Sequence, residues 1–402
     1  MPSRPGLTRA YFDHAATTPV LPEVMEVLVE HLRRLGNPSS LHASGREARR
    51  VVEESRESIA VSLGSRPGDV VFTSGGTEAD NLAVKGIAAA RRAADPARTR
   101  VLASAVEHHA VLDSLEWLAE QDFDVRLLDV DTVGRLRVEQ LRDVLAEDPA
   151  SVNMVSCMWA NNEIGTLQPL EEVVRVARAA GVPVHSDAVQ AVSTFPVNFA
   201  ASGLDAMTVT AHKLGGPVGV GALLTRRELD VAPIIHGGGQ ERQIRSGTLD
   251  TPAIAAFARA LELAVDGRER LHARLETLRT ELVGRVLDAV PDVVVNGDPR
   301  PEQRLPGIAH LGFPGCEGDS LLMLLDAAGI ECSTGSACTA GVPQPSHVLL
   351  AMGQPEVVAR GSLRFSLGHT STREEVDRLV AVLPGAVERA RAAAGFLSPG
   401  VR

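Results

Sequence analysis

One lysine of this chain stands in a segment suited to covalent chemistry. Of the 402 residues, 40 are Lys or Arg, and only Lys85 and Lys213 are lysines. An arginine guanidinium stays protonated and forms no imine, whereas a lysine amine can form a Schiff base and can shift its pKa when buried. Lys213 lies within residues 210–217 (TAHKLGGP), while Lys85 lies in an ordinary polar stretch. Lys213 is therefore a candidate Schiff-base residue; the alternative is a leftover surface charge in an arginine-rich chain.

A glycine-rich turn is a candidate anion site. Residues 73–81 (TSGGTEADN) follow a predicted strand and open a predicted helix. Glycines such as Gly76 let the backbone fold tightly against an anion, and the free N–H groups at a helix start favour a phosphate. Thr77 could donate a hydroxyl as well. A plain turn with Thr77 as the helix N-cap is the alternative, and this motif alone does not exclude it.

An acidic residue closes another predicted strand. Asp187 follows the predicted strand 182–186, and open α/β sheets bind their ligands at the carboxyl ends of parallel strands. A carboxylate there could keep a pyridine nitrogen protonated, which makes the ring an electron sink, and Gln190 could reach a ring oxygen. A helix-capping aspartate is the alternative. With Lys213 and the glycine-rich turn also at strand ends of the same sheet, the combination describes a pyridoxal phosphate site.

The elements that position these residues alternate between strand and helix. This alternation, from about residue 70 to residue 226, predicts βαβ units and a mostly parallel sheet covered by helices. The predicted strands cover residues 70–73, 101–105, 125–130, 152–158, 182–186, 206–210 and 218–224, and the predicted helices include 78–92, 109–120 and 170–180.

The pattern changes after Pro252. A long predicted helix over residues 254–289 leads into strands at 293–296, 308–313 and 363–367 and helices at 320–328 and 374–393. We therefore expect a large cofactor-binding domain over residues 13–255 and a smaller α+β domain over residues 256–402. Residues 1–12 are expected to belong to the smaller domain.

Composition narrows the class of protein. The net charge of −11, without a block of basic residues, argues against nucleic acid or an anionic membrane as partner. No apolar run approaches the roughly 18–20 residues of a membrane span, and residues 1–18 contain no apolar leader segment. The four cysteines show no CxxC spacing. These features predict a reduced, cytoplasmic protein.

Seven motifs occur in the order typical of one known family. They are residues 11–19 (YFDHAATTP), 36–40 (GNPSS), 75–78 (GGTE), 107–111 (EHHAV), 161–165 (NNEIG), 245–248 (RSGT) and 333–338 (STGSAC). Together they resemble the cysteine desulfurases of the NifS/IscS type, within the class V aminotransferase group, from about Tyr11 to Gly368. The resemblance implies the fold-type-I architecture of pyridoxal phosphate-dependent transferases, and a homodimer with sites at the subunit interface.

The resemblance also implies roles for individual residues. Lys213 would form the Schiff base with the cofactor, Asp187 would pair with the ring nitrogen and Gln190 with the phenolic oxygen. Arg364 would pair with the substrate carboxylate, a role that suits a planar guanidinium. Judged by its position alone, Arg364 could equally be an ordinary exposed arginine in a strand. Further contacts are implied for the ring-stacking His108, for Asn162 near cofactor and substrate, and for the phosphate ligands Gly76, Thr77, Thr210, His212 and, across the dimer, Thr248.

A cysteine specifies the reaction. Cys338 lies among small residues and a glycine, which predicts a mobile loop with an exposed, nucleophilic thiol. We expect Cys332 to lie in the core on a short strand, Cys157 to be buried and Cys316 to lie in a turn; the family pattern also selects Cys338. The implied reaction removes sulfur from L-cysteine, leaving L-alanine and a persulfide on Cys338. Lys213 would act as base at Cα and His108 as proton carrier.

The persulfide needs an acceptor, and several alternatives stay open. In this family the acceptors are iron–sulfur scaffold proteins or tRNA-thiolation factors, and no motif selects between them. No intrinsic metal is expected, although Cys338 could transiently ligate an iron–sulfur cluster. Cys332 and His369 depart from the usual family residues. The alternatives are a selenocysteine lyase or another class V enzyme, and a non-catalytic sulfur relay with Cys332 and Cys338 as a redox pair, which would have no use for Arg364.

Overall fold

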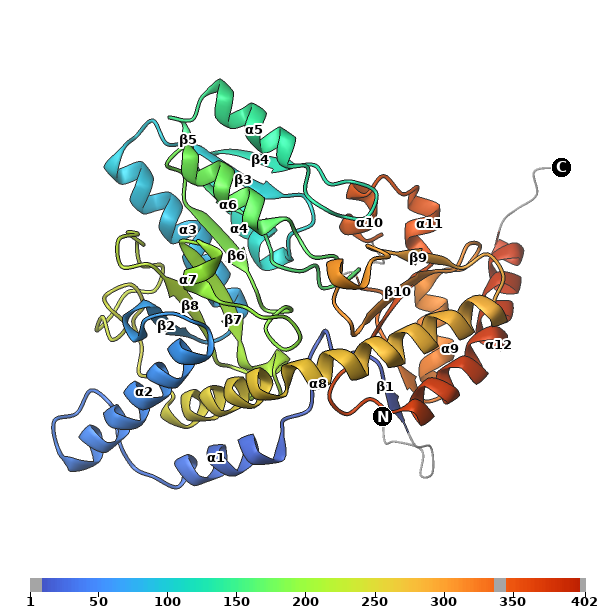
Figure 1. Cartoon of the computed structure of the whole chain (residues 1–402), viewed down its shortest axis with the longest axis horizontal. Coiled ribbons are helices and arrows are strands. Elements are labelled where there is room, and N and C mark those ends of the chain that lie inside the picture. Colours follow the sequence, from blue (N-terminus) through green and yellow to red (C-terminus); the bar gives the residue numbers. More distant parts are fainter. Residues whose placement is uncertain (1–8, 336–344, 398–402) are drawn as a thin grey trace.

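Two β-sheets and one long helix organise the chain. The structure is a computed structural model that describes residues 9–335 and 345–397. The larger sheet lies at the left of Figure 1 and the smaller one at the right, and helix α8 (Thr251–Ala289) runs along both. Within the described ranges, no helix is long and apolar enough to cross a membrane.

The large sheet is mostly parallel, as the alternating pattern predicts. Among the described residues it has seven strands in the order β2-β8-β7-β6-β5-β3-β4. The strands from β7 to β4 are parallel, while β8 runs antiparallel to both β7 and β2. The strands are β2 (Val70–Thr73), β3 (Arg100–Ser104), β4 (Asp124–Leu128), β5 (Val152–Ser156), β6 (Val184–Asp187), β7 (Ala206–Thr210) and β8 (Gly221–Thr225).

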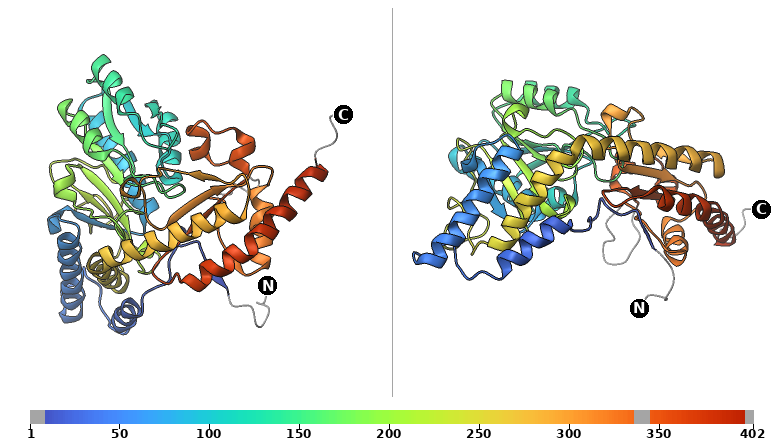
Figure 2. Two further views of the ribbon diagram at one scale, coloured as in Figure 1. Left: turned by 45° about the vertical axis from the view of Figure 1, so that its right-hand side comes forward. Right: turned by 60° about the horizontal axis from the view of Figure 1, so that its bottom comes forward.

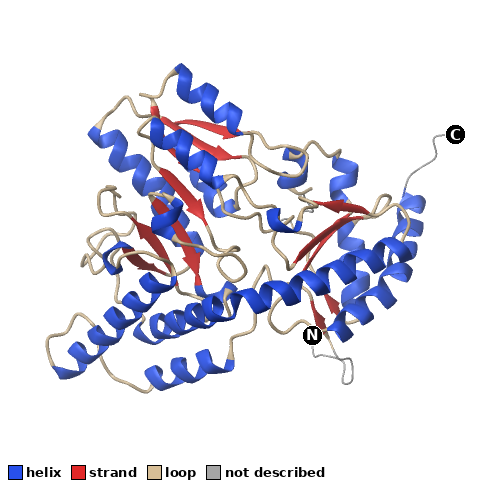
Figure 3. Ribbon diagram, in the orientation of Figure 1, coloured by secondary structure: helices blue, strands red, loops and turns tan. Residues whose placement is uncertain are grey.

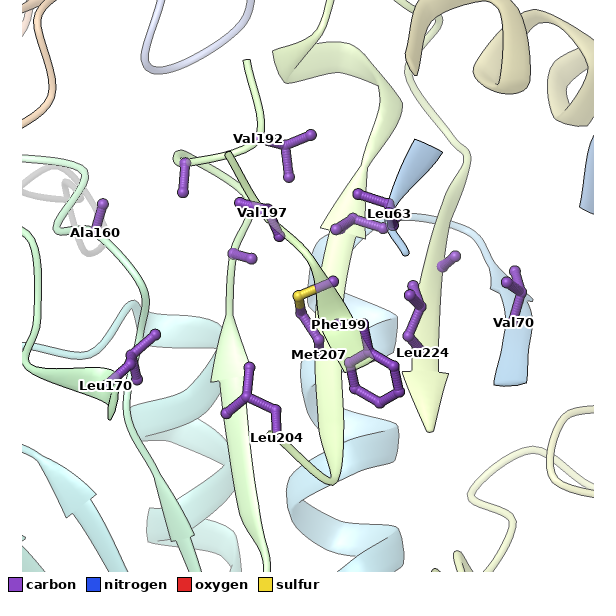
Figure 4. Packing of buried hydrophobic residues seen from close by; sticks show 14 of the residues in the cluster. Leu63, Val70, Ala160, Leu170, Val192, Val197, Phe199, Leu204, Met207 and Leu224 are labelled. Atoms are coloured by element: carbon purple, nitrogen blue, oxygen red, sulfur yellow. The ribbon is translucent and has the colours of Figure 1, made fainter. Parts of the chain in front are cut away.

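Both faces of this sheet are buried under helices. In β2, Val70 and Phe72 enter one apolar core and Val71 enters another, since successive strand residues point to opposite faces. Figure 4 shows the first core, which includes Phe199 and Met207. Burial on both faces explains why strands such as β2 and β8 are nearly continuous apolar runs. The covering helices are α3 (Gly76–Ala94) and α4 (His109–Ala119) on one face, and α5 (Val138–Glu147), α6 (Leu170–Ala179) and α7 (Phe199–Ser202) on the other.

The smaller part of the molecule is built around an antiparallel sheet of order β12-β10-β9. Its strands are β9 (Val294–Asn296), β10 (Ile308–Gly312) and β12 (Ser362–Ser366). Helices α8, α9 (Gly318–Ala327) and α12 (Arg373–Leu397) share one apolar core with it, and Figure 2 shows α8 and α12 side by side. Near the N-terminus, β1 (Ala10–Tyr11) pairs in parallel with β11 (Ile330–Glu331).

Helix α8 connects the two parts. The Asp250 side chain caps it by accepting a hydrogen bond from Ala253 N at 3.0 Å, and Pro252 suits its first turn. Leu261 belongs to the core of the large sheet and Leu278 to that of the small one. The domain boundary predicted at residue 255 therefore falls within a continuous helix, and the division into domains stays a prediction.

Several helices that the sequence reading left out complete the fold. The two longest of them pack on α8, and Figure 3 shows them below the large sheet. Besides α5 and α7, the helices that the sequence did not predict are α1 (Pro22–Leu32), α2 (Ala43–Ser62), α10 (His347–Ala351) and α11 (Glu356–Arg360), with short 3-10 turns η1 (Pro67–Asp69), η2 (Ala211–Lys213) and η3 (Pro301–Gln303).

Candidate functional site

Lys213 projects from the turn that follows β7. Its Nζ donates hydrogen bonds to the carbonyl oxygens of Ala15 at 2.6 Å and Ala16 at 2.5 Å. Burial, helped by the positive charge of Arg364, lowers the pKa of Lys213 to about 8. A sizeable fraction of this amine is therefore neutral and nucleophilic near physiological pH. Lys85, in contrast, places its Nζ 4.9 Å from the centre of the Trp117 ring, on the outer side of α3 and α4.

Asp187 and Gln190 lie beside Lys213. Asp187 is the last residue of β6, and its Oδ1 accepts a hydrogen bond from Val189 N at 2.8 Å. Burial raises the pKa of Asp187, while the positive charges of His108 and Lys213 act against this rise. Gln190 donates from Nε2 to the Ala15 carbonyl at 2.9 Å, the same oxygen that Lys213 contacts. The structure therefore brings the predicted acid, amide and amine together.

The N-terminus of α3 lies at the same edge of the sheet. Gly75 has a φ of +147°, which favours glycine, and α3 begins at Gly76. A Cβ atom at Gly76 would lie 3.3 Å from Val189 Cγ2 and 3.9 Å from Thr210 Cβ. The helix start thus faces Val189, two residues after Asp187, and the end of β7. Free N–H groups at a helix start suit an anion, and the exposed Thr77 follows at the next position.

Thr210 and His212 flank the lysine turn. Thr210 is buried at the end of β7, and its hydroxyl donates to the Val220 carbonyl at 3.2 Å. His212 Nδ1 lies 3.3 Å from the Thr17 hydroxyl, and burial lowers the pKa of His212 to about 4. His212 is therefore neutral at physiological pH and offers an anion a hydrogen bond rather than a charge.

His108 presents an exposed ring. It caps α4 by accepting a hydrogen bond at Nδ1 from Ala110 N at 3.1 Å, so the neutral ring carries its proton on Nε2. Desolvation by the surrounding protein lowers the pKa of His108, and the charge of Asp187 acts against this shift. A neutral ring with one free N–H group can stack on a ligand and exchange a proton with it.

Arg364 is a buried, paired side chain. It is 4% exposed, which overturns its reading as an exposed strand arginine. Its Nη2 donates to Asp13 Oδ1 at 2.7 Å and its Nη1 to the Asn162 carbonyl at 3.0 Å, while Nε is buried without a partner among the described residues. Arg364 also acts electrostatically on Lys213. A fixed guanidinium with an unused donor can bind a carboxylate close to the amine.

A cavity adjoins Lys213 from the other side. It measures about 410 Å³, lies between α8 and residues 14–21, and its walls include Lys213, Gln190 and His369. Asp187 and His108 do not line it. The cavity therefore borders the site at the lysine and does not contain the cluster described above.

Two predicted site residues are not among the contacts described above. Thr248 is exposed, and the nearby Arg245 donates from Nε to Glu78 Oε1 at 2.8 Å, in the first turn of α3. Cys338 lies outside the described residues, so its position and any role in iron–sulfur ligation stay predictions.

The three described cysteines are unsuited to nucleophilic attack. Cys157 is fully buried, as predicted, and burial raises its pKa well above the usual value. Cys316 follows a turn, as predicted, but its side chain is buried in the core of the small sheet. Cys332 follows β11 and packs against the same core, and burial raises its pKa to about 12. A thiol with a raised pKa is a poor nucleophile at neutral pH.

The sequence reading assigned no role to two residues of the site. Asp13 holds Arg364, and the carbonyl of Ala15 receives both Lys213 and Gln190. Both residues belong to motif 11–19, which was the sequence feature that could have pointed to them. Their contacts could not be predicted, because the partners lie about 175 to 351 positions away along the chain.

Known proteins share the sequence pattern and the fold of this chain. Residues 10–379 match the family model described as "Aminotransferase class-V". The chain belongs to the class V aminotransferase family. It is 58% identical over 386 residues to an IscS-like cysteine desulfurase of Mycobacterium tuberculosis, covering 96% of this chain and 98% of that protein. It is also 41% identical to a cysteine desulfurase of Cereibacter sphaeroides, covering 97% of this chain and 98% of that protein.

Solved structures place the chain in the same group. A NifS-like protein from Rickettsia africae superposes with a TM-score of 0.86 at 31% identity, covering 95% of this chain and all of that one. A second structure, of a NifS-like protein, gives a TM-score of 0.85 at 34% identity, covering 97% of this chain and all of that one. The fold-type-I architecture predicted from the motifs is confirmed. Within the class V family, this chain is a cysteine desulfurase of the NifS/IscS type.

Proposed function

We propose that the chain uses pyridoxal 5'-phosphate to take sulfur from L-cysteine, releasing L-alanine and leaving a persulfide on Cys338. The observation that carries the proposal is the meeting of Lys213, Asp187 and the α3 N-terminus at one sheet edge. The donor set fits this cofactor: the N–H groups beyond Gly75 suit a phosphate, the amine of Lys213 suits an aldehyde, and Asp187 suits a protonated ring nitrogen.

The residues around the lysine would hold the cofactor. Lys213 would bind its aldehyde carbon, Asp187 its ring nitrogen and Gln190 its phenolic oxygen, while His108 would cover one ring face. The bound cofactor would supply an electron sink for the substrate's Cα. The phosphate would be held by Gly76, Thr77, Thr210, His212 and, from the second subunit of a homodimer, Thr248.

Arg364 and Asn162 would bind the amino acid. The guanidinium is preorganised by Asp13 and by the Asn162 carbonyl, and its unused Nε–H is available to a carboxylate. A carboxylate there would bring Cα toward Lys213, because Asp13, which holds Arg364, is two residues from Ala15, which holds Lys213. Lys213, once released from the cofactor, would remove the Cα proton.

The sulfur step requires Cys338. Its thiolate would attack the sulfur of the bound substrate, an S–S bond would form and the Cβ–S bond would break. The electron pair of the broken bond would stay with the carbon fragment, which leaves as L-alanine after protonation. His108 would carry the proton of the substrate thiol, as its neutral ring allows. L-cysteine and one thiol thus become L-alanine and one persulfide.

The persulfide would pass to an acceptor protein. An iron–sulfur scaffold or a tRNA-thiolation factor would serve, with the enzyme acting as a cytoplasmic homodimer. Four cysteines in 402 residues do not form a dense disulfide framework, which supports a reducing compartment.

The deciding experiment follows sulfide and alanine from L-cysteine in the wild type, Lys213→Ala and Cys338→Ser. We expect the cofactor absorbance band of the wild type to be lost in Lys213→Ala. Cys338→Ser should keep the band and lose sulfide release. Full-rate sulfide release by Cys338→Ser would show that the persulfide step is wrong, and comparison with selenocysteine on the same variant would identify a lyase.

A further inference from the structure

The carboxyl group of Glu163 contacts residues on both sides of the segment that contains Cys338. Glu163 is 3% exposed and lies in a tight turn. The Oδ1 atom of Asn161 holds this turn by accepting hydrogen bonds from Glu163 N at 2.9 Å and Ile164 N at 3.0 Å. Asn161 is itself fixed, because its Nδ2 donates to the Val106 carbonyl at 3.0 Å. The Glu163 side chain therefore projects from a rigid base.

On the C-terminal side of the segment, Glu163 holds Ser346. The Ser346 hydroxyl donates to Glu163 Oε2 at 2.5 Å, and both side chains are buried. The same hydroxyl caps α10 by accepting from Leu349 N at 3.2 Å. The next residue, His347, contacts the Glu107 carbonyl through Nε2 at 2.9 Å. The start of α10 is thus tied to Glu163 and to the residue that precedes His108.

On the N-terminal side, Gly335 packs against the same carboxylate. A Cβ atom at Gly335 would lie 3.2 Å from Glu163 Oε2 and 3.4 Å from His310 Nε2, and Gly335 has a φ of +84°. The backbone conformation therefore favours glycine at this position, and the space for a side chain is tight. His310 Nε2, the other atom close to Gly335, is buried and has no hydrogen-bond partner among the described residues.

The substrate side of the site is joined to the same turn. Arg364 Nη1 donates to the carbonyl of Asn162, the residue before Glu163. Arg364 also exchanges two backbone hydrogen bonds with Ser333, at 2.7 and 3.2 Å, and the Ser333 hydroxyl accepts from Gly335 N at 3.0 Å. Hydrogen bonds and packing therefore connect residues 333–335, Ser346 and Arg364 to the turn that contains Glu163.

We propose that Glu163 is a positioning residue for sulfur transfer, which fixes Gly335 and Ser346 relative to Arg364 so that Cys338 meets the substrate sulfur. The inference rests on the proposed function. Fixing both ends of a chain segment reduces the conformations open to the residues between them, and a misplacement of about 1 Å can slow a reaction by roughly a hundredfold. The alternative is that Glu163 only stabilises the fold.

The test compares Glu163→Ala, Ser346→Ala and the double variant, each loaded with pyridoxal phosphate. Three readouts are needed: cofactor affinity, the alkylation rate of Cys338 by iodoacetamide followed by peptide mass spectrometry, and persulfide formation in a single turnover. We expect persulfide formation to fall by roughly tenfold or more, the alkylation rate to change, and cofactor affinity to stay within about threefold. The double variant should lose less than the sum of the two single variants, because both break the contact between Ser346 and Glu163.

Ser58→Ala is the matched control. Ser58 donates to Glu262 Oε1 at 2.5 Å, the same kind of contact at the same distance, between α2 and α8. This variant should leave all three readouts unchanged. Unchanged persulfide formation and alkylation in the Glu163 and Ser346 variants would overturn the proposal, as would a parallel loss of cofactor affinity. If Glu163→Ala does not fold, Ser346→Ala decides alone. A wild type that forms no persulfide would instead overturn the proposed function.

Discussion

Lys213 and Gln190 donate hydrogen bonds to the same oxygen, the carbonyl of Ala15, at 2.6 and 2.9 Å. The carbonyl belongs to the segment that leads from β1 to α1, which also supplies Asp13 to Arg364. One stretch of backbone thus sets the positions of the amine, of the amide and of the guanidinium. A carbonyl oxygen only accepts hydrogen bonds, so it can hold the lysine amine in place without donating a proton to it. The reactivity of the amine then depends on whether the amine is protonated.

The charge of Lys213 predicts a pH profile. Its pKa is lowered to about 8, so the neutral amine gains about tenfold per pH unit below pH 8 and reaches a plateau above it. Reductive alkylation of the cofactor-free protein, quantified by peptide mass spectrometry, should follow this curve. Lys85 is the internal control, because burial lowers its pKa less than it lowers that of Lys213, so its reactivity should level off at a higher pH. Arg364→Gln should move the Lys213 curve to higher pH, and an unmoved curve would contradict the electrostatic account.

Asp187→Asn tests the pairing with the cofactor ring. The amide keeps the shape but loses the charge, so affinity for pyridoxal phosphate should fall by roughly ten- to a hundredfold, the worth of a hydrogen bond to a charged group. Fluorescence titration of the cofactor-free protein measures it. Asp69→Asn is the matched control, because Asp69 is also buried and caps η1 through Arg66 N at 3.1 Å. It should lower stability and leave cofactor affinity unchanged; equal losses in both variants would contradict the pairing.

The sheet and its ligand-binding edge could be predicted from sequence because both follow from local rules. Strands covered on both faces are apolar runs, and parallel strands bring their carboxyl ends to one edge, so Asp187 and Lys213 were expected to meet. Burial of Arg364 could not be predicted, because it depends on partners at Asp13 and Asn162, far away in the chain. Helix α2 was missed for a similar reason: it packs on α8, which follows about 190 residues later.

Arg364→Lys tests recognition of the substrate carboxylate. A lysine keeps the charge but loses the planar donor set, so it cannot hold Asp13, Asn162 and a carboxylate together. KM for L-cysteine should rise by roughly ten- to a hundredfold, with cofactor affinity unchanged. Arg304→Lys is the control, since Arg304 is a buried arginine paired in a fork with Glu276 at 2.8 Å. An equal KM for wild type and Arg364→Lys would remove Arg364 from the substrate site.

Gly221→Ala tests the backbone that supports the phosphate site. A Cβ at Gly221 would lie 2.8 Å from the Val209 carbonyl oxygen and 2.9 Å from Gly75 Cα, which are backbone atoms that cannot rotate away. The variant should lose about 1–3 kcal/mol of unfolding free energy, and its affinity for pyridoxal phosphate should fall because Gly75 caps α3. Gly284→Ala, in an open part of α8, should instead gain about 0.5–1 kcal/mol. Urea unfolding and cofactor titration of both variants measure these changes. A Gly221→Ala protein that is destabilised but binds the cofactor normally would show that the α3 N-terminus does not hold the phosphate.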